Sequence, residues 1–169
     1  MVNQPIYNLL FLSSGNACRG QFAECVTRRF AAERFSVFSA GVDVAVGVDP
    51  LALDLLAYNG YETEGLHTKT WDQFLQPDAP AMDFIITLSD KSKDEMQPTW
   101  AGMPVTAHWA IANPLHVESG KVVDQVMAYR QALFQLENRI KAFASLPIAS
   151  LDSIRLKQYI NVIGLMQEF

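Results

Sequence analysis

The feature that most constrains the fold is a change of period near the start of the chain. The apolar run 6–12 (IYNLLFL) is typical of a buried strand, and it stops at the small polar residues 13–16. From 21 to 34, apolar residues recur instead at helical spacing with charges between them. The sequence therefore predicts a strand, a polar loop and a helix in direct succession.

The same alternation continues along the chain. Further strands are predicted at 35–39, 84–88 and 103–108, and a helix from Pro50 to about Gly60. A long helix is predicted at 122–143, ended by Pro147, and a last amphipathic helix at about 151–166. Strands that alternate with helices indicate an α/β fold with a parallel sheet covered on both faces. With about 150 residues per domain, residues 1–169 are expected to form one domain.

Charge and hydropathy exclude several classes of protein. The 18 acidic and 13 basic residues give a net charge of −5, and no basic run occurs, so we expect no nucleic-acid partner. The apolar stretches are shorter than the roughly 18 residues that a membrane span needs. The N-terminus has no basic flank before its apolar run, which argues against a secretory signal. We therefore expect a cytoplasmic protein without a membrane partner.

The small number of cysteines and histidines argues against disulfides and metal sites. The two cysteines, Cys18 and Cys25, are too few for a disulfide framework or a four-ligand zinc site, so both are expected to be reduced. Metal-ligand spacing is absent among the three histidines, His67, His108 and His116. We expect neither a metal nor a cofactor.

The loop between the first strand and the first helix is the candidate site. In parallel sheets, ligands bind beyond the carboxyl ends of the strands. Small residues let backbone N–H groups converge, the helix adds its positive end, and Arg19 supplies charged donors in one plane. Gly15 and Asn16 favour the positive φ that such a loop needs. The predicted ligand is phosphate, sulfate or arsenate, and the predicted contacts are Ser13, Ser14, Gly15, Asn16, Ala17, Cys18, Arg19 and Gly20. The alternative is an ordinary turn with a surface arginine.

Segment 11–24 (FLSSGNACRGQFAE) resembles the phosphate loop of the low-molecular-weight protein tyrosine phosphatases and the thioredoxin-type arsenate reductases, written Cys-x5-Arg-Ser/Thr. The likeness continues through 38–41, 48–52, 65–71 and 107–109, and covers essentially the whole chain. Residues 146–152, and the lack of a tyrosine pair after Asn113-Pro114, look more like the arsenate reductase branch. The resemblance implies a flavodoxin-like three-layer α/β/α sandwich, phosphatase I-like, with a four-stranded parallel sheet in the order 2-1-3-4.

This chain departs from the resembled pattern at the nucleophile, at the hydroxyl residue after the arginine and at the general acid. Ser13 stands where the family has its cysteine nucleophile, and an alcohol stays protonated unless a base lies beside it. Gly20 stands where the family has a hydroxyl, and Asn113 replaces the aspartate that serves as general acid. An amide donates a hydrogen bond but cannot give up a proton to a leaving group.

The redox pathway of the arsenate reductase branch is also altered. Ser89 and Gln97 stand where the resemblance leads us to expect further cysteines. Several departures that agree with one another favour a naturally degenerate site over a single inactivating substitution. Asp90 is expected to cap a short helix, and His108 to help position the loop of Asn113.

Two functional hypotheses follow. In the first, the protein is a pseudoenzyme that binds an oxyanion, free or carried by a phosphorylated protein, with Ser13 as a neutral floor and Asn113 as a loop contact. The alternative is an active phosphatase or arsenate reductase that uses Ser13 or Cys18. Cys18 lies beside Arg19 and could be a thiol of low pKa. Its place on the flank of the loop, however, predicts that the thiol lies behind the bound anion, away from in-line attack. Cys25 is expected in the core.

Overall fold

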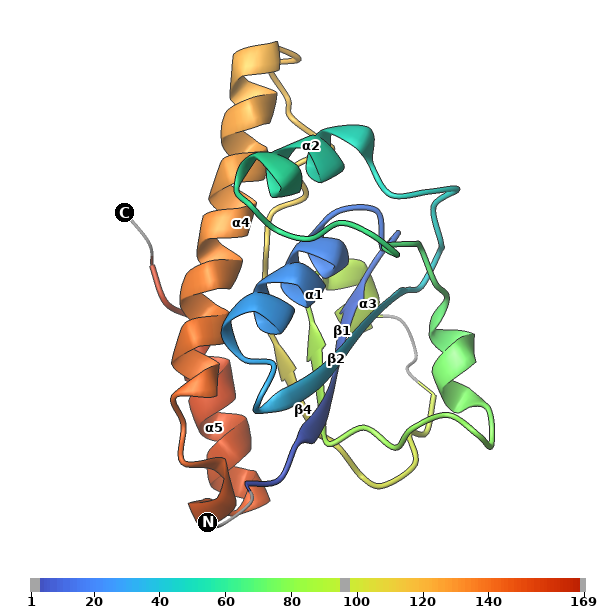
Figure 1. Ribbon diagram of the computed structural model, residues 1–169, viewed down its shortest axis with the longest axis vertical. Helices are drawn as coiled ribbons and strands as arrows, with labels where there is room; N and C mark the ends of the chain where they lie inside the picture. The colour runs from blue at the N-terminus through green and yellow to red at the C-terminus, as the bar shows by residue number, and fades with distance from the viewer. Residues whose placement is uncertain (1–3, 95–97, 168–169) are drawn as a thin grey trace.

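Four parallel strands form the centre of the computed structural model, which describes residues 4–94 and 98–167 (Figure 1). The strands are β1 (Tyr7–Ser13), β2 (Phe35–Gly41), β3 (Phe84–Thr87) and β4 (Val105–His108). Their order is β2-β1-β3-β4, and all three pairings are parallel. The predicted fold class and strand order are confirmed.

The helices are α1 (Arg19–Phe30), α2 (Pro50–Tyr58), α3 (Asp90–Asp94), α4 (Val122–Ala144) and α5 (Ser153–Ile163), with 3-10 turns η1 (Trp71–Leu75) and η2 (Ile148–Ser150). Their ends differ from the prediction where side chains or turns decide them. The first helix stops at Phe30 rather than Arg34, because the chain turns back into β2. The last begins at Ser153, where the Asp152 side chain accepts a hydrogen bond from the Arg155 N–H.

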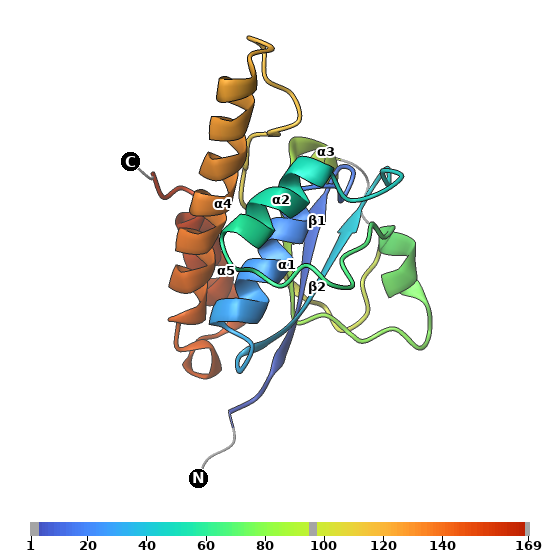
Figure 2. The ribbon, with the colours of Figure 1, turned by 45° about the horizontal axis from the view of Figure 1, so that its top comes forward.

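The alternation of side chains along β1 divides the core into two clusters. Leu9 and Phe11 face α1, α2, α4 and α5, whereas Leu10 and Leu12 face η1 and the segment around Trp100. Figure 2 shows the long helices on one side of the sheet and the green η1 segment on the other. Both faces are covered, but the second only by short elements.

The tryptophans lie in or against these clusters. Trp109 is fully buried against Phe11 and Phe143, and Trp71 packs edge-on against Trp100 with ring centroids 6.3 Å apart. Among the described residues, no helix combines the length and the apolar character that crossing a bilayer requires.

Candidate functional site

The loop between β1 and α1 directs its carbonyl groups away from the site. The carbonyl oxygens of Ser13, Ser14, Gly15 and Ala17 accept hydrogen bonds of 2.9 to 3.2 Å from N–H groups of segment 42–49. The N–H groups of residues 14–19 donate to no partner within 4–94 or 98–167. Because buried backbone donors are nearly always paired, this run of free N–H groups is the sign of an anion-binding nest.

One residue of the loop has the left-handed conformation that a nest requires. Asn16 has φ 59°, as predicted, whereas Gly15 is not among the residues with positive φ, so that part of the prediction is wrong. The Asn16 amide explains how an L-residue is held there. Its Nδ2 donates to Ser39 Oγ over 2.9 Å, and its Oδ1 accepts from the Lys69 N–H over 2.9 Å.

The close packing of β2 against the loop requires a glycine at position 41, which lies outside the loop and had no role in the sequence prediction. A Cβ on Gly41 would lie 3.0 Å from the carbonyl carbon of Gly15 and 3.1 Å from the Asn16 nitrogen, whereas a Cβ on Gly15 would have ordinary contacts. The resemblance at 38–41 contained this signal, but only the tertiary structure shows that β2 presses against the loop.

Buried polar side chains support the loop from behind. Ser39 Oγ donates to Glu24 Oε1 over 2.8 Å, and Lys69 Nζ lies 3.3 Å from the same oxygen. Gln21 Nε2 donates to the Asn16 carbonyl over 2.8 Å. Glu24 and Lys69 are both buried, and their ion pair and the hydrogen bonds around it form a network that fixes Asn16. The sequence analysis assigned no role to Glu24 or Lys69.

Arg19 opens α1 and turns back over the loop. Its Nη1 donates to the Ile111 carbonyl and its Nη2 to Ser14 Oγ, both over 2.9 Å, which leaves three of its five N–H donors uncommitted. Burial lowers the pKa of Arg19, and the neighbouring Cys18 and Asp90 oppose that shift. The guanidinium remains a cation held at the mouth of the nest.

The two candidate nucleophiles have different surroundings. Ser13 Oγ is buried and has no hydrogen-bond partner within the described part of the chain. Cys18 caps the start of α1 in the apolar core, and burial, reinforced by Asp49, raises the pKa of its thiol far above the ordinary value despite Arg19. The structure therefore argues against the low-pKa thiol considered for Cys18. Cys25 is buried in the core, as predicted.

The described residues bring the predicted site together. A pocket of about 30 Å³ is lined by Ser13, Ser14, Gly15, Asn16, Ala17, Cys18, Arg19, Asn113 and Leu115. The Oδ1 of Asn113 accepts a hydrogen bond from the Leu115 N–H over 3.1 Å. Gly20 does not line this pocket, and it packs against the side chains of Asn16 and Ser39 instead. No carboxylate or imidazole is among these lining residues, so the described part of the chain offers the pocket no general base.

Three expectations around the site need correction or are untested. Ser89, not Asp90, caps α3, because its Oγ accepts a hydrogen bond from the Ser92 N–H over 3.1 Å. Among the described residues, the polar partners of the His108 ring lie outside the Asn113 loop. Its Nδ1 lies 2.7 Å from Thr87 Oγ1 and its Nε2 3.5 Å from Asp90 Oδ1. Gln97 lies outside the described residues.

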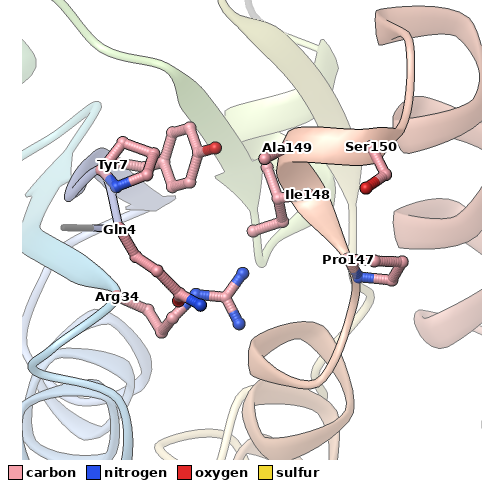
Figure 3. Close-up of a pocket in the computed structure, with 8 residues that line it drawn as sticks. Gln4, Tyr7, Arg34, Pro147, Ile148, Ala149 and Ser150 are labelled. Atoms are coloured by element: carbon pink, nitrogen blue, oxygen red, sulfur yellow. The ribbon is translucent and has the colours of Figure 1, made fainter. Parts of the chain in front are cut away.

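A wider hollow of about 350 Å³ lies at the opposite end of the sheet, around the start of β1 (Figure 3). Arg34 projects toward it between Tyr7 and the loop of Pro147, but its guanidinium donates to the carbonyls of Ala144 and Leu146 that follow α4. Ligands of parallel sheets bind at the carboxyl ends of strands, so the 13–19 loop is the better candidate. The described residues contain no cluster of three or more side chains that could hold a metal ion.

Comparison with known proteins is consistent with this geometry. Arsenate reductase from Halalkalibacterium halodurans is 29% identical over 136 residues, which cover 80% of this chain and 94% of that protein. The Bacillus subtilis arsenate reductase is 26% identical over 85% of this chain and 97% of its own length. The crystal structure of arsenate reductase from Archaeoglobus fulgidus superimposes with a TM-score of 0.64 at 28% identity, and the match covers 82% of this chain and 99% of that one.

A tyrosine phosphatase from Erwinia amylovora has the same fold, with a TM-score of 0.60 at 22% identity over 83% of this chain and 90% of that chain. The model of the low molecular weight phosphotyrosine protein phosphatases matches residues 8–153. Because that match spans most of the chain, this protein belongs to the low molecular weight phosphotyrosine protein phosphatase family.

Proposed function

We propose that this protein binds a tetrahedral oxyanion, phosphate or arsenate, in the 13–19 loop and holds it without covalent turnover. The observation that carries the proposal is the set of free N–H groups of residues 14–19, with the Arg19 guanidinium beside them. The three uncommitted donors of Arg19 suit two oxygens of one anion. The anion is either free or a phosphoryl group on a partner protein.

The absence of turnover rests on the residues that line the pocket. Ser13 lines the pocket with a hydroxyl that has no hydrogen-bond partner among the residues the structure describes, and these lining residues include no base that could take its proton. Asn113 cannot protonate a leaving group. Cys18 keeps its proton, since burial raises the pKa of its thiol. Loss of one member of a catalytic unit costs nearly as much as loss of all, so turnover close to background follows.

A pocket of about 30 Å³ has room for little more than one water molecule. We expect Arg19 to release the Ser14 hydroxyl when the anion binds, because Nη2 then exchanges a neutral hydroxyl acceptor for a charged oxygen of the anion.

The test pairs calorimetric titration of phosphate, arsenate and sulfate with hydrolysis of an aryl phosphate. We expect binding without hydrolysis, and an affinity for phosphate that falls about a hundredfold in Arg19→Ala, since two charge-assisted hydrogen bonds of roughly 1.5 kcal/mol or more each are lost. Arg155→Ala removes the same charge from an exposed position of α5 and is the matched control.

Two results would overturn the proposal. Unchanged affinity in Arg19→Ala would remove the loop from consideration as the site. Hydrolysis above background that disappears in Ser13→Ala or Cys18→Ala would make the protein an enzyme with that residue as its nucleophile.

A further inference from the structure

A second hollow lies at the carboxyl ends of β3 and β4. Its volume is about 200 Å³, several times that of the loop pocket, and its walls come from β3, α3, β4 and α5. Thr87 ends β3 and His108 ends β4, while α3 contributes Lys93 and α5 contributes Lys157 and Asn161. This edge of a parallel sheet is where ligands bind.

The charges around the hollow are predominantly positive. The Lys93 ammonium group has no hydrogen bond or ion pair with a described side chain, and Lys157 Nζ gives one of its three N–H groups to Thr106 Oγ1 over 3.1 Å. The facing carboxylate among the described side chains is Asp90, whose side chain is 86% exposed. Within the described part of the chain, these two ammonium groups therefore face one solvated carboxylate.

His108 is held rigidly in the wall of this space. Its Nδ1 lies 2.7 Å from the Thr87 hydroxyl, and its backbone N–H donates to Asn161 Oδ1 over 3.2 Å, so both the ring and the strand end are fixed. Its Nε2 is buried, has no hydrogen-bond partner among the described residues and lies 3.5 Å from Asp90 Oδ1. The Thr87 hydroxyl has one proton, for which Nδ1 and the Ala107 carbonyl, 3.3 Å away, compete. When that proton is donated to Nδ1, Nε2 of the neutral ring carries the ring proton.

The groups around His108 favour the neutral ring. Burial lowers the pKa of His108, Lys93 lowers it further, and Asp90 opposes both effects. The remaining charged group at the hollow, Lys157 of α5, adds to the positive field. A dianion placed among these groups would reverse the balance and favour the imidazolium.

From this arrangement we infer a second anion site, in which Lys93, Lys157 and His108 bind a phosphate or sulfate group independently of the 13–19 loop. Two ammonium groups act as separate point charges and suit an anion with several oxygens, whereas a planar carboxylate is better matched by an arginine fork. Hydroxyl groups of Thr87 and Thr106 complete the polar walls. The phosphate group is either an inorganic ion or part of a small phosphomonoester.

The test follows the His108 ring proton by NMR while phosphate is added to the full-length protein over a range of pH. We expect the ring signal to shift and the pKa of His108 to rise with bound phosphate. Lys93→Gln combined with Lys157→Gln should lower the affinity about tenfold, and Lys121→Gln should leave it unchanged. These lysines are exposed, so the variants should fold.

Arg19→Ala separates this site from the loop, because it should leave the His108 titration unchanged. A His108 signal that does not respond to phosphate, that responds equally in the double lysine variant, or that stops responding in Arg19→Ala would each overturn the proposal. A parallel titration with glycerol phosphate identifies the source: tighter binding than that of inorganic phosphate assigns the site to a phosphomonoester, and equal or weaker binding assigns it to the free ion.

Discussion

Gly20 packs directly against the amide of Asn16: a Cβ on residue 20 would lie 2.7 Å from Asn16 Nδ2 and 3.1 Å from Ser39 Cβ. The amide could move aside only by giving up its hydrogen bond to Ser39. The absence of a side chain at residue 20 and the position of the Asn16 amide are therefore coupled by packing.

Gly20→Ser should destabilise the protein by about 1–3 kcal/mol, because the added atoms overpack a buried site. Chemical denaturation measures the change, and Gly20→Ala separates the steric effect of Cβ from any effect of the hydroxyl. Equal stability of Gly20→Ser and the parent protein would show that Asn16 moves freely, contrary to the packing described.

Replacement of Asn16 should damage both stability and anion binding. Asn16→Ala removes the hydrogen bond to Ser39 Oγ, which keeps only Glu24 as a partner, and leaves the Lys69 N–H unpaired. It also requires a residue with Cβ to keep φ 59° without the amide that holds it there. We expect a loss of about 3 kcal/mol or more in the free energy of unfolding. Asn16→Gly should recover about 1 kcal/mol of it, since glycine adopts positive φ readily. If the two variants are equally stable, the backbone conformation at Asn16 contributes nothing.

Restoring the family residues tests the proposed reason for low turnover. In Ser13→Cys, a thiol placed among free N–H groups beside Arg19 should ionise near neutral pH, which the pH dependence of alkylation by iodoacetate reports. With Asn113→Asp added to supply an acid, hydrolysis of an aryl phosphate should rise well above that of the parent. A double variant no more active than the parent would show that the loop geometry, rather than the residue types, prevents turnover.

Stability at alkaline pH should depend on Cys25. Burial raises the pKa of this thiol from an ordinary 9.0 to about 11, so between these values the folded state retains a proton that the unfolded state releases. The free energy of unfolding therefore falls as the pH rises from about 9 to 11, by roughly 3 kcal/mol for two pKa units. Denaturation of parent and Cys25→Ala across this range measures the difference, and parallel curves would contradict the assignment.

The elements followed from local patterns in the sequence. The apolar runs at 6–12 and 84–88 and the helical period of 122–143 predicted strands and a helix that the structure contains, with ends displaced by a few residues. Periodicity reports which face of an element is buried, and that is a local property of the chain. It could not place the end of α1 or the cap of α3, because single turns and side-chain hydrogen bonds decide those positions.

The candidate site was likewise predictable only in its local features. The sequence by itself determined the composition of the 13–20 loop, its position after β1 and the residue types available to an anion, including the positive φ of Asn16. Only the tertiary structure joined Arg19 to the Ile111 carbonyl, Asn16 to Lys69, and the loop carbonyls to segment 42–49. Such contacts join residues far apart in the chain. The crossovers of the parallel sheet bring them together, and no local pattern encodes that proximity.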